Sequence, residues 1–254
     1  MIARHPFFVG DPPRVLAHRG LATSAPENTL LAFAAAVGIG VTYLETDVHA
    51  SADGVAVVAH DPELSRVAAG RSEKVDQLTV AELSKVDLGD GQHMPTLAEA
   101  LDAFPDARFN IDLKSAAAVE PTVEAVRAVR AEERVLLTSF SERRRSAALA
   151  LLPEVATSAS GPRFAAALLA SVVRGGAAVR TALRGLHAVQ IPERALGLDT
   201  VSPARLRAFH AAGVEVHVWT VNEPHTMREL LDRGVDGLVT DRADLALAVL
   251  AERS

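Results

Sequence analysis

The sequence predicts an α/β fold, and within that class a single-domain (β/α)8 TIM barrel. Short apolar runs typical of strands alternate with alanine-rich helical stretches from one end of the chain to the other. About eight such units within 254 residues match the size of a closed barrel of parallel strands joined by helices. No Gly-, Ser- or Pro-rich linker divides the chain, so we expect one domain over residues 1–254. A doubly wound open sheet is the alternative architecture.

Nine short segments have the length and the apolar content of strands. They are residues 15–18, 41–48, 55–60, 109–114, 134–140, 155–159, 186–191, 214–220 and 236–240. The stretches between most of them have helical periodicity, and two of these, 202–213 and 223–234, end at glycine, as helices commonly do.

Residues 61–96 break this alternation. The stretch is polar, and it is too long for an ordinary connection between a strand and a helix. We therefore interpret it as a short insertion after the second strand, and we expect it to be a lid or wall over the functional site.

The composition excludes several classes of function. The net charge of -6 and the pI near 5.8 leave no basic excess for binding nucleic acid or for a polybasic membrane patch. The chain has no cysteine, so any metal would be held by oxygen or imidazole, and a hard cation is favoured. Near the N-terminus, Gly-Asp-Pro-Pro interrupts the apolar stretch before a signal-peptide core or a membrane span could form. We expect a cytoplasmic protein without stable membrane insertion that binds small molecules, and homo-oligomerisation is compatible with the sequence.

Three of the predicted strands have one polar and one apolar face. The polar faces hold Tyr43, Glu45, Asp47 and His49 on the first strand, Asn110, Asp112 and Lys114 on the second, and Glu215, His217 and Trp219 on the third. Because helices intervene between these strands, exposure at a sheet edge does not explain the polar faces. A barrel does, since helices cover its outside and polar side chains converge at its C-terminal mouth. We expect Tyr43, Asn110 and Glu215, which lie deeper, to be packing residues with paired hydrogen bonds.

Ionisable side chains are concentrated in residues 45–61. Glu45, Asp47, His49, His60 and Asp61 flank two short apolar runs that read as buried strands. Burying a charge without a partner is costly, so an ion, a substrate or a set of counter-charges is expected there. The segment therefore predicts a functional site.

Several motifs follow one another in order between residues 15 and 247. They are AHRGLATSAPENTLLAF, ETDVHASADGVAVVAHDPELSR, PTLAEAL, NIDLK, TSF, and VWTVNEP followed by LLDRGVDGLVTDRAD. In this order they resemble the motifs of the glycerophosphodiester phosphodiesterases, a family of metal-dependent (β/α)8 barrels. The resemblance implies that the substrate is a small-molecule glycerophosphodiester, which is hydrolysed to sn-glycerol 3-phosphate and an alcohol.

The resemblance also implies roles for individual residues. The histidines of HRG and HD, here His18 and His60, would be the catalytic acid/base pair. The two acids of E-x-D, here Glu45 and Asp47, would be ligands of a divalent cation, Mg2+ or Ca2+. A third acid on the next strand completes the set. In this chain it is Asp112, where the family usually has the longer Glu, which leaves direct and water-mediated contact with the ion both open.

The chemistry of a phosphodiester accounts for the predicted substrate-binding residues. The substrate is an anion that repels nucleophiles, so its phosphoryl oxygens must be neutralised. Arg19 offers a planar fork for these oxygens and Lys114 a point charge. Trp219 would form an apolar wall for the glycerol or the alcohol. Glu27 either begins a helix or orients Arg19 or the substrate.

The two histidines titrate in the range that both proton transfers require. Attack by water and attack by the neighbouring glycerol hydroxyl, through a cyclic phosphate, both stay open. Asp241 is expected to close the last loop or to cap the final helix. The family's L-x-R-T-x-G motif reads LSRVAAG in the insertion, which leaves the contribution of this segment to substrate contact open.

Three other functions fit parts of the sequence. A lysophospholipase D-like phosphodiesterase acting on lysophospholipids would need an apolar entry path, and the insertion supplies little of one. A metal-assisted carbon–carbon lyase would use the acids but gives His18, His60 and Arg19 no joint task. A non-catalytic barrel that binds a phosphate ligand would not need both histidines.

Overall fold

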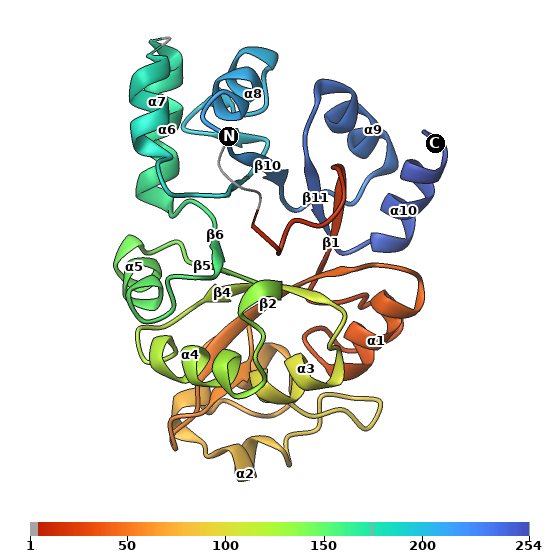
Figure 1. Cartoon of the computed structure of the whole chain (residues 1–254). Coiled ribbons are helices and arrows are strands. Elements are labelled where there is room, and N and C mark those ends of the chain that lie inside the picture. Colours follow the sequence, from red (N-terminus) through yellow and green to blue (C-terminus); the bar gives the residue numbers. More distant parts are fainter. Residues whose placement is uncertain (1–4, 174, 254) are drawn as a thin grey trace.

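The computed structural model describes residues 5–173 and 175–253. Within these residues eight parallel strands form the centre and helices surround them (Figure 1). The strand order is β6-β5-β4-β2-β1-β11-β10-β7. A parallel bridge between Ser158 and Ala188 joins the two end strands, and the Ala159 amide donates a hydrogen bond of 3.0 Å to the Ala188 carbonyl. The sheet therefore closes on itself, which confirms the predicted barrel and excludes the open sheet.

The barrel strands lie close to the predicted segments. In chain order they are β1 (Arg14–His18), β2 (Tyr43–Ala50), β4 (Arg108–Leu113), β5 (Val135–Thr138), β6 (Ala156–Thr157), β7 (Ala188–Ile191), β10 (Glu215–Val218) and β11 (Gly237–Thr240). The remaining predicted segment, 55–60, contains β3 (Ala56–Val58), but this strand pairs antiparallel with β2 and lies outside the barrel. Its assignment to the alternating series was wrong, because the short turn between β2 and β3 leaves no room for the helical crossover that a parallel neighbour needs.

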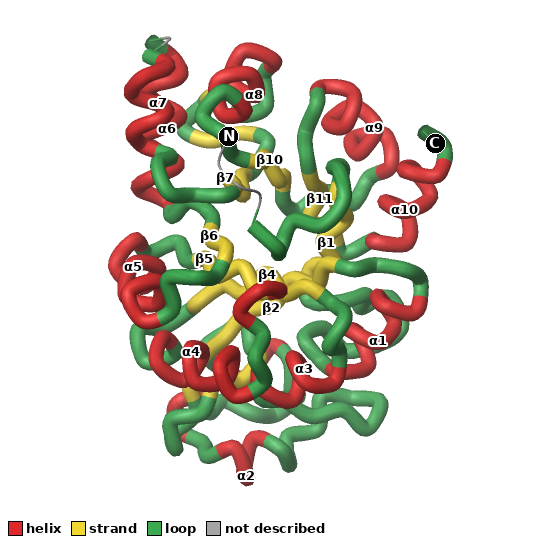
Figure 2. Tube along the Cα trace, in the orientation of Figure 1, coloured by secondary structure: helices red, strands yellow, loops and turns green. Residues whose placement is uncertain are grey.

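Helices follow the barrel strands and cover the outside of the barrel (Figure 2). They are α1 (Leu30–Gly38), α3 (Leu97–Ala103), α4 (Val119–Ala128), α5 (Glu142–Leu151), α6 (Gly161–Val172), α7 (Gly176–Ala182), α8 (Pro203–His210), α9 (Pro224–Arg233) and α10 (Ala243–Ala251). Local signals set their ends. The Thr29 hydroxyl accepts a hydrogen bond from the Ala32 amide at the start of α1, and Gly234 takes a left-handed conformation after α9. No helix in the described ranges is long and apolar enough to cross a membrane.

Residues 61–96 form a layer of short elements beside the barrel. These elements are η1 (Leu64–Arg66), η2 (Val75–Gln77) and α2 (Val80–Leu83), at the lower edge of Figure 1. Buried side chains of the segment, among them Leu64, Val75 and Leu83, pack with Val57 of β3 in a small core of their own. The insertion is therefore held by apolar packing as well as by its links to the barrel.

Two connections depart from the simple strand–helix repeat. After β6 the chain forms two consecutive helices, α6 and α7, which lie side by side (Figure 1). After β7 it forms a small antiparallel hairpin of β8 (Arg194–Ala195) and β9 (Leu198–Asp199). The sequence analysis did not predict the small hairpin, because strands of two residues leave no alternation to recognise.

Side chains alternate along the barrel strands as predicted. On β1, Val15 and Ala17 belong to the core between strands and helices, whereas Leu16 belongs to a separate cluster inside the barrel. His18 points the same way as Leu16, since side chains two residues apart share a face. The strand register places His18 beside Glu45 on the neighbouring strand. Polar side chains of the inner face therefore meet near the C-terminal ends of the strands.

The opposite end of the barrel is closed by a buried ion pair. Arg14, only 3% exposed, donates hydrogen bonds to both carboxylate oxygens of Glu215 (2.7 and 2.8 Å) and to the Tyr43 hydroxyl (2.8 Å). Phe7 and Phe8 of the N-terminal segment pack in the same cluster as Tyr43. The predicted packing roles of Tyr43 and Glu215 are confirmed, because both side chains have hydrogen-bond partners inside the barrel.

This ion pair makes stability depend on acid pH. Burial acts to raise the pKa of Glu215, but the hydrogen bonds and charge of Arg14 and His217 outweigh it, and the pKa lies well below its usual range. The folded state therefore holds this proton less tightly than the unfolded state does. The resulting stability is present above the ordinary carboxylate pKa and is lost as the pH falls toward the folded pKa.

We expect Glu215→Gln to destabilise the protein by about 3 kcal/mol at neutral pH, because it leaves the Arg14 charge buried without its partner. Urea unfolding of both proteins between neutral pH and about pH 3 should show this difference shrinking below about pH 4. The control is Glu229→Gln on exposed α9, where the His225 partner is itself exposed. A difference that stayed constant down to about pH 3 would contradict the role of the ion pair.

Candidate active site

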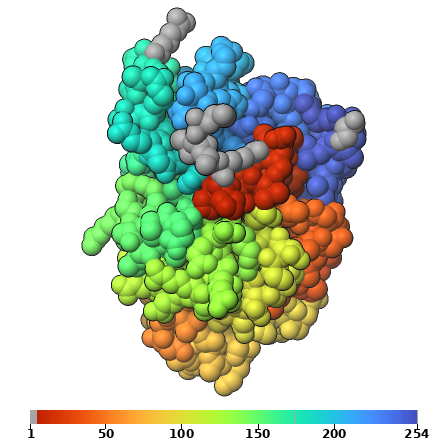
Figure 3. Space-filling view, in the orientation of Figure 1, coloured from red at the N-terminus to blue at the C-terminus, as the bar shows by residue number. Residues whose placement is uncertain are grey.

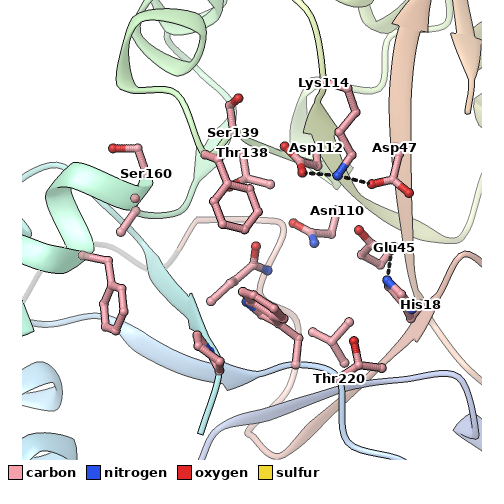
Figure 4. A pocket seen from close by; sticks show the side chains of 18 of the residues that line it. His18, Glu45, Asp47, Asn110, Asp112, Lys114, Thr138, Ser139, Ser160 and Thr220 are labelled. Atoms are coloured by element: carbon pink, nitrogen blue, oxygen red, sulfur yellow. Dashed lines mark hydrogen bonds and ion pairs between the residues drawn. The ribbon is translucent and has the colours of Figure 1, made fainter. Parts of the chain in front are cut away.

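A cavity of ≈ 520 Å³ opens at the C-terminal ends of the barrel strands (Figure 4). It is lined by eight of the nine residues predicted for the site, namely His18, Arg19, Glu45, Asp47, His60, Asp112, Lys114 and Trp219. The ninth, Glu27, does not line the cavity and contacts it through Arg19. The fold therefore gathers residues from β1, β2 and β4 and from the loops that follow β1, β3, β4 and β10.

The loop after β1 turns sharply and directs Arg19 into the site. Arg19 (φ 58°) and Asn28 (φ 57°) both have left-handed backbone conformations, which are uncommon for residues other than glycine and concentrate at functional sites. Between them, a Cβ on Gly20 would lie 2.6 Å from the carbonyl carbon of Ala32 in α1. Only glycine fits there, which explains the glycine of the HRG motif: it lets α1 approach the loop closely.

Three buried carboxylates, Glu45, Asp47 and Asp112, form the centre of the site. The Lys114 ammonium lies between Asp47 Oδ1 (2.8 Å) and Asp112 Oδ2 (2.7 Å), as Figure 4 shows. Arg19 Nε lies 3.3 Å from Asp47 Oδ2. Burial acts to lower the pKa of Lys114, but the two carboxylates outweigh it and the pKa is raised. Lys114 therefore stays charged, and two cations balance Asp47.

The negative charge of Glu45 is balanced less fully by nearby cations than that of Asp47. His18 Nε2 lies 3.9 Å from its Oε2, and the Arg19 backbone amide donates a hydrogen bond of 3.2 Å to the same oxygen. Burial and the charge of Asp47 raise the pKa of Glu45 to about 8. Burial also raises the pKa of Asp112, although Lys114 opposes it. The centre of the site thus contains more carboxyl groups than its cationic side chains can neutralise.

Carboxylate oxygens without full compensation are the donors that a hard divalent cation prefers. Besides Glu45, Asp112 Oδ1 is buried without a hydrogen-bond partner, and so is Asn110 Oδ1. The expectation of paired hydrogen bonds at Asn110 was therefore wrong: the residue lines the cavity and its oxygen has no partner. Among the side chains in 5–173 and 175–253, no three His, Asp or Glu converge closely enough to bind one ion. The donor set fits a divalent cation by its chemistry, and the ligand arrangement stays a prediction.

Each predicted catalytic histidine is held through Nδ1 by a carboxylate of its own. Asp241 Oδ1 lies 2.6 Å from His18 Nδ1, and Asp61 Oδ1 lies 2.7 Å from His60 Nδ1. The hydrogen bond from His18 lowers the pKa of Asp241; at Asp61 burial acts to raise the pKa, but hydrogen bonds from Arg66 and His60 lower it. An ionised carboxylate only accepts hydrogen bonds, so each Nδ1 carries a hydrogen and each Nε2 can exchange a proton.

Asp241 is a site residue for which the sequence analysis expected only a structural role, in closing the last loop or capping the final helix. Arg242, not Asp241, is the N-cap of α10, and the Asp241 carboxylate also accepts a hydrogen bond of 2.7 Å from Asn222. Burial acts to lower the pKa of His18, but the Asp241 hydrogen bond and the charge of Glu45 raise it above its ordinary value. The sequence could not assign this contact, because β1 and β11 are distant in the chain and become neighbours only when the barrel closes.

The insertion contacts the site through Arg66. The Arg66 guanidinium donates a hydrogen bond of 2.7 Å to Glu27 Oε1 and another to Asp61, the carboxylate that holds His60. Glu27 Oε1 also accepts a hydrogen bond of 2.9 Å from Arg19 Nη1. An unbroken series of alternating charges therefore connects Arg19 to His60 across the mouth of the barrel.

This series bears on two expectations from the sequence. Of the roles left open for Glu27, its contact with Arg19 supports the orienting one, since α1 has Thr29 and not Glu27 as its N-cap. None of the residues lining the cavity belongs to 61–96, so the insertion is not the predicted lid or wall of the cavity. Its contribution is the charged link at Arg66, which the sequence did not reveal because its partner Glu27 is distant in the chain and becomes a neighbour only in the folded protein.

Apolar side chains complete the lining of the cavity. Trp219 lies where it was predicted, and its ring meets that of Phe140 edge to face at 5.9 Å. Phe164 of α6 and Leu196, at the tip of the β8–β9 hairpin, line the cavity as well. Sequence reasoning missed these three residues because they lie on loops and a helix, where no alternation marks an inward face.

Residues 18–245 match the model of the glycerophosphoryl diester phosphodiesterase family. The chain belongs to this family. Its membership confirms the resemblance that the ordered motifs predicted, and it covers the whole region from the HRG histidine to the start of the last helix.

Individual relatives agree with this assignment. The chain is 47% identical over 240 residues to a probable glycerophosphodiester phosphodiesterase 2 of Mycobacterium tuberculosis, covering 94% of this chain and 90% of the relative. A putative glycerophosphoryl diester phosphodiesterase of Silicibacter pomeroyi has a similar crystal structure (TM-score 0.82, 27% identity, 98% and 96% of the two chains). An Oleispira antarctica phosphodiesterase in complex with the product sn-glycerol-3-phosphate is also similar (TM-score 0.78, 25% identity, 94% and 97%).

The contact between Asp241 and His18 can be tested in solution. We expect Asp241→Asn to lower the pKa of His18, because the variant removes the negative charge that stabilises the imidazolium. NMR titration of the His18 ring in protein stripped of divalent ions measures it. Asp244→Asn, which changes a nearby aspartate that lies in the first turn of α10 and pairs with Arg242, is the matched control and should leave His18 unchanged. An unaltered His18 pKa in Asp241→Asn would show that this carboxylate does not hold the ring.

Proposed function

We propose that this chain hydrolyses glycerophosphodiesters to sn-glycerol 3-phosphate and an alcohol, with a divalent cation, Mg2+ or Ca2+, as cofactor. One observation carries the proposal: two imidazoles, each held by a carboxylate, line the same cavity as two cationic side chains and a group of buried acids. Membership of the phosphodiesterase family supports it, as does the bound product in the Oleispira relative.

Binding of the substrate follows from the charges in the cavity. Arg19, oriented by Glu27, presents a planar guanidinium to the phosphoryl oxygens, and Lys114 adds a second positive charge. Glu45, Asp47 and Asp112 would hold the divalent cation, which when bound would polarise the phosphoryl group. Trp219 covers the carbon atoms of the glycerol or the alcohol.

Hydrolysis forms one bond from phosphorus to the attacking oxygen and breaks the bond to the leaving alcohol. One histidine accepts the proton of the attacking oxygen at Nε2, and the other donates a proton from Nε2 to the leaving oxygen. Asp61 and Asp241 keep the other ring nitrogens of His60 and His18 protonated, so that both rings act through Nε2. Direct attack by water completes the reaction in one displacement. Attack by the neighbouring glycerol hydroxyl uses the same two transfers but forms a cyclic phosphate. Water then attacks its phosphorus and breaks the bond to the ring oxygen, with the two histidines exchanging roles.

A lysophospholipase D-like activity is the second candidate. The insertion offers no apolar entry path, but Phe140, Phe164 and Leu196 give the cavity an apolar wall on another side. A hydrocarbon chain could leave the site along this wall. The carbon–carbon lyase explains neither the two carboxylate-held histidines nor the cations beside them, and a barrel that only binds a phosphate ligand explains the cations but not the two histidines.

Other expectations from the sequence stay predictions. They are one domain over residues 1–254 with 61–96 as its insertion, a cytoplasmic location, homo-oligomerisation, and the absence of nucleic-acid partners.

Product release from a panel of substrates tests the proposed function. We expect protein stripped of metal to be inactive on glycerophosphocholine and to regain release of sn-glycerol 3-phosphate with Mg2+, Ca2+ or Mn2+. His18→Gln and His60→Gln should each lower kcat by roughly 10²–10⁴-fold, because each removes one proton transfer. His225→Gln, on exposed α9, is the control. Unchanged turnover in both histidine variants would contradict the proposal, and faster turnover of lysophosphatidylcholine would favour the second candidate.

Removal of the charged link in the insertion tests how the site is held. We expect Arg66→Met to lower kcat/KM by about 10- to 100-fold, since Glu27 and Asp61 lose the partner that fixes Arg19 and His60. Arg66→Lys should recover part of the loss, because an ammonium keeps the positive charge but lacks the planar fork with which the guanidinium reaches both carboxylates. Arg71→Met, which changes an arginine of the same insertion paired with Glu73, should leave kcat/KM within about twofold. Equal kinetics for Arg66→Met and Arg71→Met would rule out the link.

A further inference from the structure

The helical hairpin of α6 and α7 extends sideways from the barrel. Figures 1 and 3 show it at the upper left, where it projects from the barrel beyond α5, to which its inner end is joined by the Arg163–Glu142 ion pair (3.5 Å). Arg163 of α6 fixes the two helices to each other, because its guanidinium donates hydrogen bonds to the carbonyls of Ala182 (2.5 Å) and Arg184 (2.7 Å). The hairpin is therefore a defined element whose outer surface the barrel does not cover.

Large apolar side chains are exposed along this hairpin. Leu169 is 57% exposed, Val172 49% and Val173 77%. They are spaced three and four residues apart at the outer end of α6, so they lie on one side of the helix. We call these three residues the hairpin face. Scattered single apolar residues are normal on a protein surface, but adjacent ones indicate a binding surface.

The hairpin face is continuous with the mouth of the cavity. Phe164 and Ala165, in the first turns of α6, line the cavity, and Ala165 lies four residues before Leu169 on the same side of the helix. Phe140 and Leu196, which are 61% and 69% exposed, line the cavity too. Half of the ten large apolar side chains exposed in the described residues thus belong to the hairpin face or to this rim.

The charge of the same segment is opposite to that of the whole chain. Residues 155–192 contain four arginines and no aspartate or glutamate, although the chain has a net charge of -6. The arginines Arg180 and Arg184 are exposed on and after α7. Whole-chain composition conceals this local positive region, which is why the sequence analysis found no basic patch.

We propose that the α6–α7 hairpin docks on an anionic lipid surface. Leu169, Val172 and Val173 enter the apolar boundary of the lipid, and Arg180 and Arg184 contact the phosphates of the head groups. Exposed apolar side chains flanked by arginine, without any carboxylate, are the combination that binds such surfaces. A symmetric contact with a second copy would set two positive segments against each other, which is unfavourable.

Docking in this way would bring the mouth of the cavity close to the lipid, because α6 begins at the cavity and ends at the hairpin face. Molecules that leave or enter the lipid surface would then have a short path to the site. The proposal concerns the surface of the protein and does not depend on the reaction that the cavity performs.

Vesicle flotation of the full chain tests the proposal. We expect binding to vesicles of phosphatidylcholine mixed with phosphatidylglycerol, little binding to phosphatidylcholine alone, and weaker binding at high salt. The double variant Leu169→Ser with Val172→Ser should lower the partition coefficient at least about tenfold. Arg180→Gln with Arg184→Gln should lower it by about fivefold for each charge removed. The arginine variant alters no buried contact, so it tests the proposal even if the apolar variant folds poorly.

The matched control is Leu31→Ser with Val37→Ser, which changes two apolar residues on α1 that are each 38% exposed. It should leave vesicle binding unchanged, and all three double variants should hydrolyse soluble glycerophosphocholine like the wild type. Failure of the wild type to float with anionic vesicles would overturn the proposal. So would equal binding by the hairpin variants, or a dimer in sedimentation velocity that the hairpin variants dissociate, which would make the hairpin face an interface between copies.

Discussion

Negative charge buried at the mouth of the barrel is the constraint on which the rest of the site depends. Strand register places Glu45 and Asp47 of β2 beside Asn110 and Asp112 of β4, so their carboxylates cannot separate without breaking the sheet. Burial in this position raises the pKa of Glu45 to about 8 and raises that of Asp112 as well. Buried carboxyl groups are tolerated only if cations, hydrogen-bond donors or a ligand balance their charge. The elements around the site supply such partners.

Side chains of alternating charge surround the buried acids and balance their negative charge. Lys114 and Arg19 contact the acids directly, and Glu27 and Asp61 hold the next positive groups in turn. Because each outer residue has a partner of opposite sign on both sides, the arrangement fixes side chains that would otherwise be mobile. The insertion contributes to this order through a single guanidinium, which links the loop after β1 to the loop after β3. Positioning of the site thus extends well beyond the residues that line the cavity.

Much of the fold and the centre of the site could be predicted from the sequence. Period-two alternation marked Glu45, Asp47 and Asp112 as one inner face, and the alternation of strands with helices gave the barrel. The failures have specific causes. The segment containing β3 looked like a barrel strand because local pattern does not distinguish a parallel from an antiparallel partner. Asp241 was expected to close a loop or cap a helix, because an aspartate suits those roles as well as it suits holding a histidine ring. Only the pairing of β1 with β11, which brings Asp241 to His18, decides between them.

The sequence by itself determined which side chains face inward, since that depends on backbone geometry within a strand. It also determined the family motifs, which are local in the chain. The tertiary structure alone decided which carboxylate holds which imidazole, how the insertion reaches Arg19 and His60, and where the apolar side of the cavity continues along α6. These contacts join residues that are distant in the chain, and their energies depend on burial and on partners that exist only after the barrel has closed.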